Sequence, residues 1–113
     1  MIEIYHNPRC SKSRQGLAIL EESGKDYKII KYLDENLGPE QLKNIIAKLD
    51  IKPIELVRKN EAIWKSDYKG KTLSDQEIIE AMVANPKLIE RPIVTNGNDA
   101  VVGRPPETIL NII

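Results

Sequence analysis

The sequence predicts an α/β protein in which a four-stranded mixed β-sheet is flanked by helices and interrupted by an inserted helical segment. Three observations lead to this prediction. Residues 2–32 follow a strand–helix–strand order, which is the pattern of a parallel βαβ unit. Helical patterns dominate residues 38–90. Two short β-forming runs around an Asn-Gly pair then predict a hairpin, and a last helix follows it.

The first strand–helix–strand unit is marked by changes in the hydrophobic pattern. Residues 2–5 alternate as a strand does, and residues 6–10 form a polar loop. Residues 11–23 carry apolar side chains at helical spacing, and Gly24 suits the left-handed residue that follows many helices. Residues 27–32 are rich in β-forming side chains and therefore predict the second strand.

The middle of the chain predicts several helices. Pro39 suits a first helical position, and apolar residues then recur at i, i+3, i+4 and i+7, namely Leu42, Ile45, Ile46 and Leu49. Pro53 opens a shorter helix with Arg58 at its end. Ser74–Glu77 form a capping box that begins another helix. Residues 60–73 are mixed and polar, so we expect irregular or short helical structure there.

The end of the chain predicts a hairpin and a short helix. Two β-forming runs within residues 91–103 flank Asn96-Gly97, a strong hairpin signal. Pro105-Pro106 then leads into the last helix. The complete order of elements is the thioredoxin-like arrangement with a helical insertion at roughly residues 38–90. The length suits one domain over residues 1–113.

Composition and charge argue against several classes of function. Hydrophobic residues make up 41% of the chain, and 17 Lys and Arg residues balance 17 Asp and Glu residues. Nothing therefore indicates binding to nucleic acid or to a membrane surface. No apolar run approaches the roughly 20 residues that span a bilayer, and the chain does not start like a signal peptide. With one cysteine, an internal disulfide is impossible, so we expect a cytoplasmic protein that relies on thiols from other molecules.

Cys10, the only cysteine, lies at the junction between the first strand and the first helix. Free N–H groups and the dipole at a helix N-terminus favour negative charge, and Arg9, Lys12 and Arg14 add positive charge nearby. A free thiol has a pKa of about 8.5. This setting predicts a lower pKa and a nucleophilic thiolate. A lone cysteine is more often a small buried hydrophobe, but polar flanking residues do not build a core.

Arginines stand at the ends of three predicted elements. Arg91 and Arg104 flank the open end of the hairpin, so antiparallel pairing should bring their guanidinium groups together. Two guanidinium groups make a bidentate site for a tetrahedral oxyanion. Arg58 is the third, although any one of them alone is more often a solvated surface residue. In a thioredoxin-like fold, we expect the Arg91–Pro92 bond to be cis and to face Cys10.

His6 precedes Cys10 by four residues and could tune the ionisation of the thiol, although an isolated histidine is more often structural. Because the chain has no second histidine or cysteine, we expect no metal site. A phosphatase loop would need arginine at the position of Gly16, so that class is excluded. Cys10 and Ser13 have the Cys-x-x-Ser spacing of monothiol redox enzymes.

Four motifs in this order resemble those of the glutaredoxin-linked arsenate reductases: Tyr5–Arg14, Leu56–Asn60, Arg91–Val94 and Gly103–Glu107. The likeness covers essentially the whole chain. It implies that Cys10 attacks arsenate to form a thioarsenate intermediate and that His6 influences the ionisation of Cys10. It also implies an oxyanion site made with Ser13, Arg14, Arg58, Arg91 and Arg104.

The resemblance also implies the reducing partners. Glutathione is expected as reducing co-substrate and glutaredoxin as protein partner, with no bound cofactor, and we expect a monomer. The family's typical Gly-Thr-Ser-Arg run after the cysteine is here Ser11–Arg14, with Lys12 as an added cation. Two alternatives remain: an Spx-type regulator that binds RNA polymerase, in which Ser13 replaces a second cysteine, and a glutathione-dependent thiol oxidoreductase on another substrate. The three arginines favour the reductase.

Overall fold

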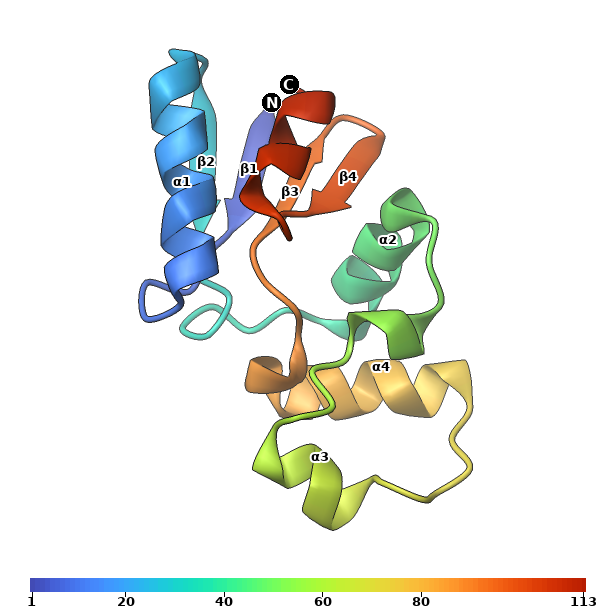
Figure 1. Ribbon diagram of the computed structural model, residues 1–113. Helices are drawn as coiled ribbons and strands as arrows, with labels where there is room; N and C mark the ends of the chain where they lie inside the picture. Colours follow the sequence, from blue (N-terminus) through green and yellow to red (C-terminus); the bar gives the residue numbers. More distant parts are fainter. The chain divides into compact units, whose positions relative to one another are not determined.

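The computed structural model describes residues 1–113, which form two compact units (Figure 1). The first unit contains Met1–Glu35 and Arg91–Ile113, and the second contains Asn36–Glu90. The second unit therefore corresponds closely to the helical insertion expected over residues 38–90. That the chain acts as a single domain stays a prediction.

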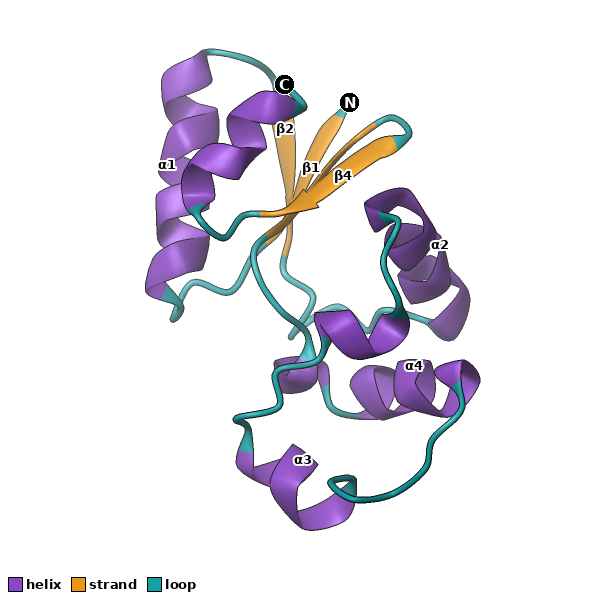
Figure 2. Cartoon of the chain, turned by 45° about the vertical axis from the view of Figure 1, so that its right-hand side comes forward, coloured by secondary structure: helices purple, strands orange, loops and turns teal.

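The first unit contains a four-stranded sheet in the order β2-β1-β3-β4 (Figure 2). β1 (Ile2–Tyr5) pairs in parallel with β2 (Tyr27–Ile30), and α1 (Ser11–Ser23) connects them. β1 also pairs antiparallel with β3 (Ile93–Asn96), which pairs antiparallel with β4 (Asp99–Val102). The predicted α/β fold with a mixed sheet is confirmed.

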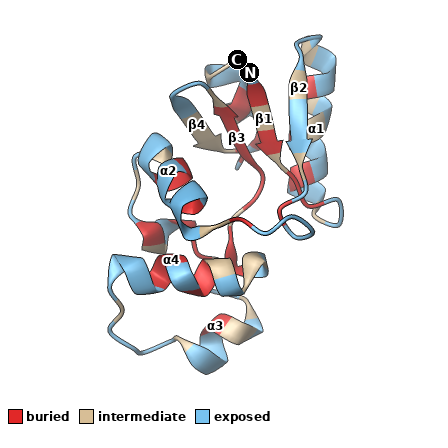
Figure 3. Cartoon of the chain, turned by 180° about the vertical axis from the view of Figure 1, so that it is seen from behind, coloured by how far each residue is buried: buried red, intermediate tan, exposed pale blue.

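One face of this sheet carries the core of the first unit. α1 and the 3₁₀ helix η3 (Pro106–Asn111) lie together over that face (Figure 2). The two central strands, β1 and β3, contain most of the buried residues of the sheet (Figure 3). The core is a cluster of aliphatic side chains: Ile2, Ile4, Leu20, Val94 and Ile109. Burying each such side chain contributes roughly 1.5–3 kcal/mol, and this attaches α1 firmly to the sheet.

Pro92 fills a narrow space between α1 and the residue that follows β4. A Cβ atom at Gly16 would lie 2.9 Å from Pro92 Cγ and 3.0 Å from Ile109 Cδ1. A Cβ atom at Gly103 would lie 2.9 Å from Pro92 Cγ and 3.1 Å from Ile109 Cδ1. Only glycine therefore allows the proline ring to pack this closely at either position. The packing fixes Pro92 and, through the peptide bond, the backbone of Arg91.

This packing predicts the effect of Gly16→Ala. Alanine is favoured over glycine in a helix by roughly 1 kcal/mol, so propensity alone predicts a more stable protein. The close approach to Pro92 predicts the opposite, because overpacking costs about 1–3 kcal/mol. We expect a net loss in the free energy of unfolding, measured by urea denaturation. The exposed neighbour Gln15→Ala is the control, and a stabilised Gly16→Ala variant would show that the space is not limiting.

The hairpin closes one residue later than predicted. Asn96 is the last residue of β3 and pairs with Asp99, so the two turn residues are Gly97 and Asn98 and not Asn96 and Gly97. Gly97 has a φ of 63°, which suits the first turn residue of a two-residue hairpin loop. Asn96 is retained in the strand, and its Nδ2 donates a hydrogen bond to the Ile112 carbonyl at 2.7 Å. This bond ties the hairpin to the C-terminal residues.

The second strand is also shorter than predicted. β2 ends at Ile30, and Lys31 begins a turn. The Lys31 carbonyl accepts hydrogen bonds from the N–H groups of Asp34 and Glu35, at 3.0 and 2.9 Å. Residues 31–32 of the predicted strand therefore lie outside the sheet, although they end a run that is rich in β-forming side chains.

The second unit is helical throughout. Its elements are α2 (Pro39–Leu49), η1 (Pro53–Leu56), α3 (Ala62–Asp67), α4 (Asp75–Ala84) and η2 (Pro86–Leu88). The predicted capping box is confirmed, since Ser74 Oγ accepts from the Glu77 N–H at 3.2 Å and Glu77 Oε1 accepts from the Ser74 N–H at 3.0 Å. In neither unit is any helix both long and apolar enough to cross a membrane.

The short helix that begins at Pro53 differs from the prediction. It is a 3₁₀ helix that ends at Leu56, so Arg58 lies beyond it and does not close it. The backbone instead becomes extended, because Val57 forms an antiparallel bridge with Ile89. The Arg58 N–H donates to the Leu88 carbonyl at 2.7 Å. This distant pairing ends the helix earlier than the sequence indicates.

Candidate active site

Cys10 is the N-cap residue of α1, with an extended backbone at φ −95° and ψ 123°. Its N–H donates to the Asn7 carbonyl at 3.0 Å, and its carbonyl accepts the Arg14 N–H at 3.0 Å as the first bond of the helix. The sulfur therefore lies at the helix N-terminus, where free N–H groups favour an anion. The first turn contains no acidic residue to oppose that effect.

The surroundings of Cys10 lower the pKa of its thiol. Burial by itself raises this pKa, but hydrogen bonds from the Ser13 backbone, the Arg91 side chain and the Lys12 backbone outweigh it, together with the charge of Arg91. The direction agrees with the sequence-based prediction. The main cationic contribution, however, comes from Arg91, which is far from Cys10 in the sequence, and not from the neighbouring cations.

This pKa shift predicts the pH dependence of Cys10 alkylation. Only the thiolate reacts, so the alkylation rate should rise with pH. The midpoint of that rise should lie below the ordinary thiol pKa of about 8.5. Replacing Arg91 by methionine should move the midpoint upward, because a hydrogen bond and a charge that stabilise the thiolate are lost. The measurement is the iodoacetamide reaction rate against pH. A wild-type midpoint at or above the ordinary value would contradict the lowered pKa.

Arg91 and Arg104 lie together at the open end of the hairpin, as predicted. Arg104 Nε donates to the Arg91 carbonyl at 2.9 Å, and Arg104 Nη2 lies 3.8 Å from Cys10 Sγ. The Gly103 N–H donates to the Pro92 carbonyl at 2.8 Å, which holds the two chain segments side by side. The predicted cis bond at Arg91–Pro92 is confirmed. The hairpin thus places two guanidinium groups beside the sulfur.

The second X-Pro bond of the site, Arg104–Pro105, is also cis, which the sequence analysis did not predict. Arg91 is buried, whereas Arg104 is exposed. The two arginines therefore differ in their access to solvent although both contact Cys10. Arg91 is suited to hold the thiolate, and Arg104 is suited to meet an anion that approaches from solvent.

His6 is connected to the Cys10 loop through Ser13. His6 Nδ1 lies 2.6 Å from Ser13 Oγ, which also accepts a hydrogen bond from the Asn7 N–H at 2.9 Å. The pKa of His6 is lowered, first by burial and then by the charges of Lys31 and Arg14, while Ser13 acts in the opposite direction. A neutral His6 with an unprotonated Nδ1 can accept a hydrogen bond from the Ser13 hydroxyl group. His6 therefore acts on the loop that presents Cys10.

The other predicted site residues have different positions. The Ser13 hydroxyl is fully buried, so only its backbone N–H faces Cys10. Arg14 is exposed, and its Nη1 donates to the Pro8 carbonyl at 2.9 Å, which supports the loop. The roles of these two residues in substrate binding stay predictions.

Arg58 belongs to the second unit. Its Nε lies 3.4 Å from Glu61 Oε1, and both side chains are partly exposed. An ion pair of this kind contributes little to stability. The predicted approach of Arg58 to Cys10 stays a prediction.

Sequence reasoning missed Asn7, which shapes the loop before Cys10. Its Oδ1 accepts the Arg9 N–H at 3.0 Å, while its backbone contacts Ser13 Oγ and the Cys10 N–H. Asparagine before Pro8 is a known turn signal, because its side chain bonds the backbone two residues on. That signal could have identified Asn7 as the residue that fixes the turn into the helix.

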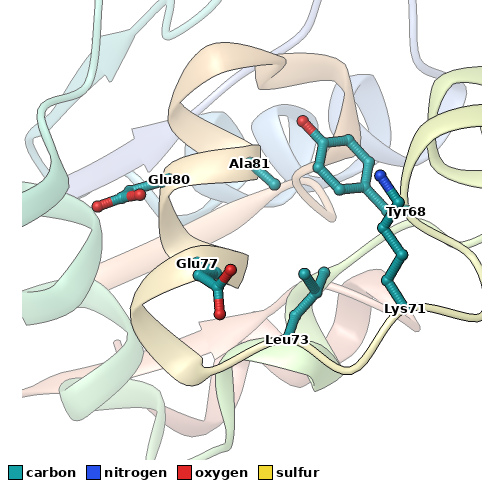
Figure 4. Close-up of a pocket in the computed structure, with 6 residues that line it drawn as sticks. All are labelled: Tyr68, Lys71, Leu73, Glu77, Glu80 and Ala81. Carbon is teal, nitrogen blue, oxygen red and sulfur yellow. The ribbon is translucent and has the colours of Figure 1, made fainter.

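The second unit contains a cavity of about 370 Å³ (Figure 4). It is lined by Tyr68, Lys71, Leu73, Glu77, Glu80 and Ala81. These residues offer two carboxylates and one ammonium group but no nucleophilic thiol or imidazole. The chain contains no group of three or more His, Cys, Asp or Glu side chains placed to hold a metal ion. The residues around Cys10 are therefore the stronger candidate for chemistry.

Comparison with known proteins gives consistent results. Residues 5–112 match the ArsC family. The chain is 43% identical to an arsenate reductase of Haemophilus influenzae over 112 residues, which cover 97% of each chain. It is 41% identical to the uncharacterized protein YfgD of Escherichia coli, over 99% of this chain and 96% of that protein. The solved structure of an arsenate reductase from Vibrio cholerae superposes with a TM-score of 0.94 at 43% identity, covering 99% of this chain and 97% of that one.

Proposed function

Because the chain belongs to the ArsC family, we propose that it reduces arsenate to arsenite through Cys10, with glutathione as reductant and glutaredoxin to regenerate the thiol. The observation that supports this most strongly is the position of the sulfur. It lies at a helix N-terminus, with Arg104 Nη2 at 3.8 Å and a hydrogen bond from Arg91. A thiolate beside two guanidinium groups suits nucleophilic attack on a tetrahedral oxyanion.

In the first step, the Cys10 thiolate attacks the arsenic atom. A sulfur–arsenic bond forms, an arsenic–oxygen bond breaks, and the oxygen leaves as water after taking up protons. Arsenic remains in the +V state. Arg91 and Arg104 stabilise the negative charge on the arsenate oxygens, because guanidinium groups donate paired hydrogen bonds to oxyanions.

In the second step, the thiolate of glutathione attacks the Cys10 sulfur. A disulfide bond forms and the sulfur–arsenic bond breaks, with its electron pair remaining on arsenic, which becomes +III and leaves as arsenite. The thiol proton passes to solvent. A glutaredoxin thiol then reduces the mixed disulfide. An external thiol is required because Cys10 is the only cysteine of the chain.

The test is an assay in which arsenate, glutathione and glutaredoxin are supplied and the oxidation of glutathione is coupled to NADPH consumption. We expect NADPH consumption that requires arsenate, glutathione and glutaredoxin together. If the protein exchanges disulfides with glutathione but consumes no arsenate, it is a thiol oxidoreductase that acts on another substrate.

A further inference from the structure

A cavity of about 340 Å³ lies beside the Cys10 loop in the first unit, and we call it the Lys31 pocket. It is lined by residues 6–9 and by Lys31, Leu33 and Asp34. These residues follow β1 and β2, the two parallel strands, whose pairing continues in a hydrogen bond from the His6 N–H to the Ile30 carbonyl at 2.9 Å. Ligands of α/β proteins commonly bind outside the carboxyl ends of parallel strands. The volume lies within the roughly 300–1,000 Å³ typical of small-molecule sites.

The Lys31 pocket lies beside the residues that lead into Cys10. Asn7 and Arg9 line the pocket, and Arg9 immediately precedes Cys10. The Cys10 N–H donates to the Asn7 carbonyl at 3.0 Å, so one tight turn joins the pocket wall to the nucleophile. The pocket wall therefore reaches to within one residue of the nucleophile along the chain.

The charges of the pocket are mixed. Arg9 and Lys31 are exposed cations, and Asp34 is an exposed anion. Lys31 and His6 both line the pocket, and the charge of Lys31 helps to lower the pKa of His6. Leu33 is 40% exposed, which is unusual for a large hydrophobic side chain of this protein. Hydrogen bonds from the Asp34 and Glu35 N–H groups to the Lys31 carbonyl fix the backbone of this turn.

We propose that the Lys31 pocket binds glutathione and presents its sulfur to Cys10. Glutathione carries two carboxylates and one ammonium group, and the pocket supplies two cations and one carboxylate. Arg9 and Lys31 bind the carboxylates, Asp34 binds the ammonium group of the γ-glutamyl residue, and Leu33 contacts the peptide. This inference rests on the proposed function, in which glutathione is the reductant, and it adds the residues that recognise it.

The test uses disulfide exchange without arsenate. The Cys10 thiolate attacks one sulfur of glutathione disulfide, which forms a mixed disulfide on Cys10 and releases one glutathione thiolate. The uncharged hydroxyethyl disulfide undergoes the same exchange but has no group for the pocket to recognise. We measure both second-order rates by mass spectrometry, for the wild type, Lys31→Gln and Asp34→Asn. Lys28→Gln, on an exposed part of β2 outside the pocket, is the matched control.

We expect Lys31→Gln to slow exchange with glutathione disulfide by up to roughly fivefold, the scale of one exposed ion pair, while exchange with hydroxyethyl disulfide is unchanged. Asp34→Asn should have a smaller effect in the same direction, and Lys28→Gln none. Equal slowing with both disulfides would mean that Lys31 acts only on thiol reactivity, and unchanged rates would mean that the pocket does not bind glutathione. Either outcome overturns the inference. If the protein reduces no arsenate but Lys31→Gln slows exchange with glutathione disulfide alone, only the proposed function is overturned.

Discussion

Replacing Cys10 by serine is expected to lower arsenate reduction by at least roughly 10³-fold, the scale of losing a catalytic nucleophile. Serine has nearly the same shape, but its hydroxyl group is not ionised at neutral pH and cannot form the sulfur–arsenic or disulfide bond. The fold should be retained, because the backbone bonds of residue 10 to Asn7 and Arg14 do not involve the side chain. Serine is also a favourable N-cap residue.

The measurement is the glutaredoxin-coupled rate for Cys10→Ser, with the urea midpoint measured in parallel. Ser11→Ala, an exposed change at the next position, is the matched control and should retain activity. Substantial arsenate reduction by a folded Cys10→Ser protein would show that another group carries the chemistry.

The second large effect is expected from the arginine pair. Removing one charge-assisted hydrogen bond costs roughly 1.5–3 kcal/mol, so Arg91→Ala or Arg104→Ala should each lower the rate by about 10- to 100-fold. Lysine should substitute poorly, because it keeps the charge but loses the planar fork that binds two oxygens. For Arg104 it also loses the Nε donor that bonds the Arg91 carbonyl at 2.9 Å.

The two arginines should be distinguishable by a second measurement. Arg91 lowers the pKa of Cys10, so Arg91→Ala should slow both iodoacetamide alkylation at neutral pH and arsenate reduction. Arg104 is exposed, so Arg104→Ala should affect arsenate reduction more than alkylation. Lys28→Ala is the control for a general loss of positive charge. Near-normal arsenate reduction by both arginine variants would refute a shared oxyanion site.

Arg58 provides an independent test of the predicted third guanidinium group. The same loss of about 10- to 100-fold is expected for Arg58→Ala if this residue binds the oxyanion in the transition state. The exposed neighbour Lys59→Ala is a matched control within the second unit. If both variants retain activity, the site consists of Cys10 with Arg91 and Arg104 alone.

Much of the fold could be predicted because its signals are local. Gly24 adopts a positive φ of 70° after α1, and the Ser74 capping box begins α4, both as the sequence indicates. A distant contact decided one of the features that differed. The helix at Pro53 ends early because Val57 pairs with Ile89, a residue separated from it by α3 and α4.

The site could be predicted in part for the same reason. The position of Cys10 at a helix start and the meeting of Arg91 with Arg104 follow from element order and hairpin geometry. The burial of Ser13 against His6 does not, because a Cys-x-x-Ser spacing gives no information on where a hydroxyl group points. The close packing of Gly16 on Pro92 likewise depends on residues from opposite ends of the chain.

The most direct test of the proposed chemistry is the covalent state of Cys10. The protein is incubated without oxygen with arsenate and glutathione, in the absence of glutaredoxin, and its intact mass is measured together with the arsenite released. We predict one glutathione attached to Cys10 by a disulfide bond, with one arsenite formed per chain, and neither product when arsenate is omitted. A protein that carries no glutathione after this incubation, or the same amount without arsenate, would contradict arsenate reduction through Cys10.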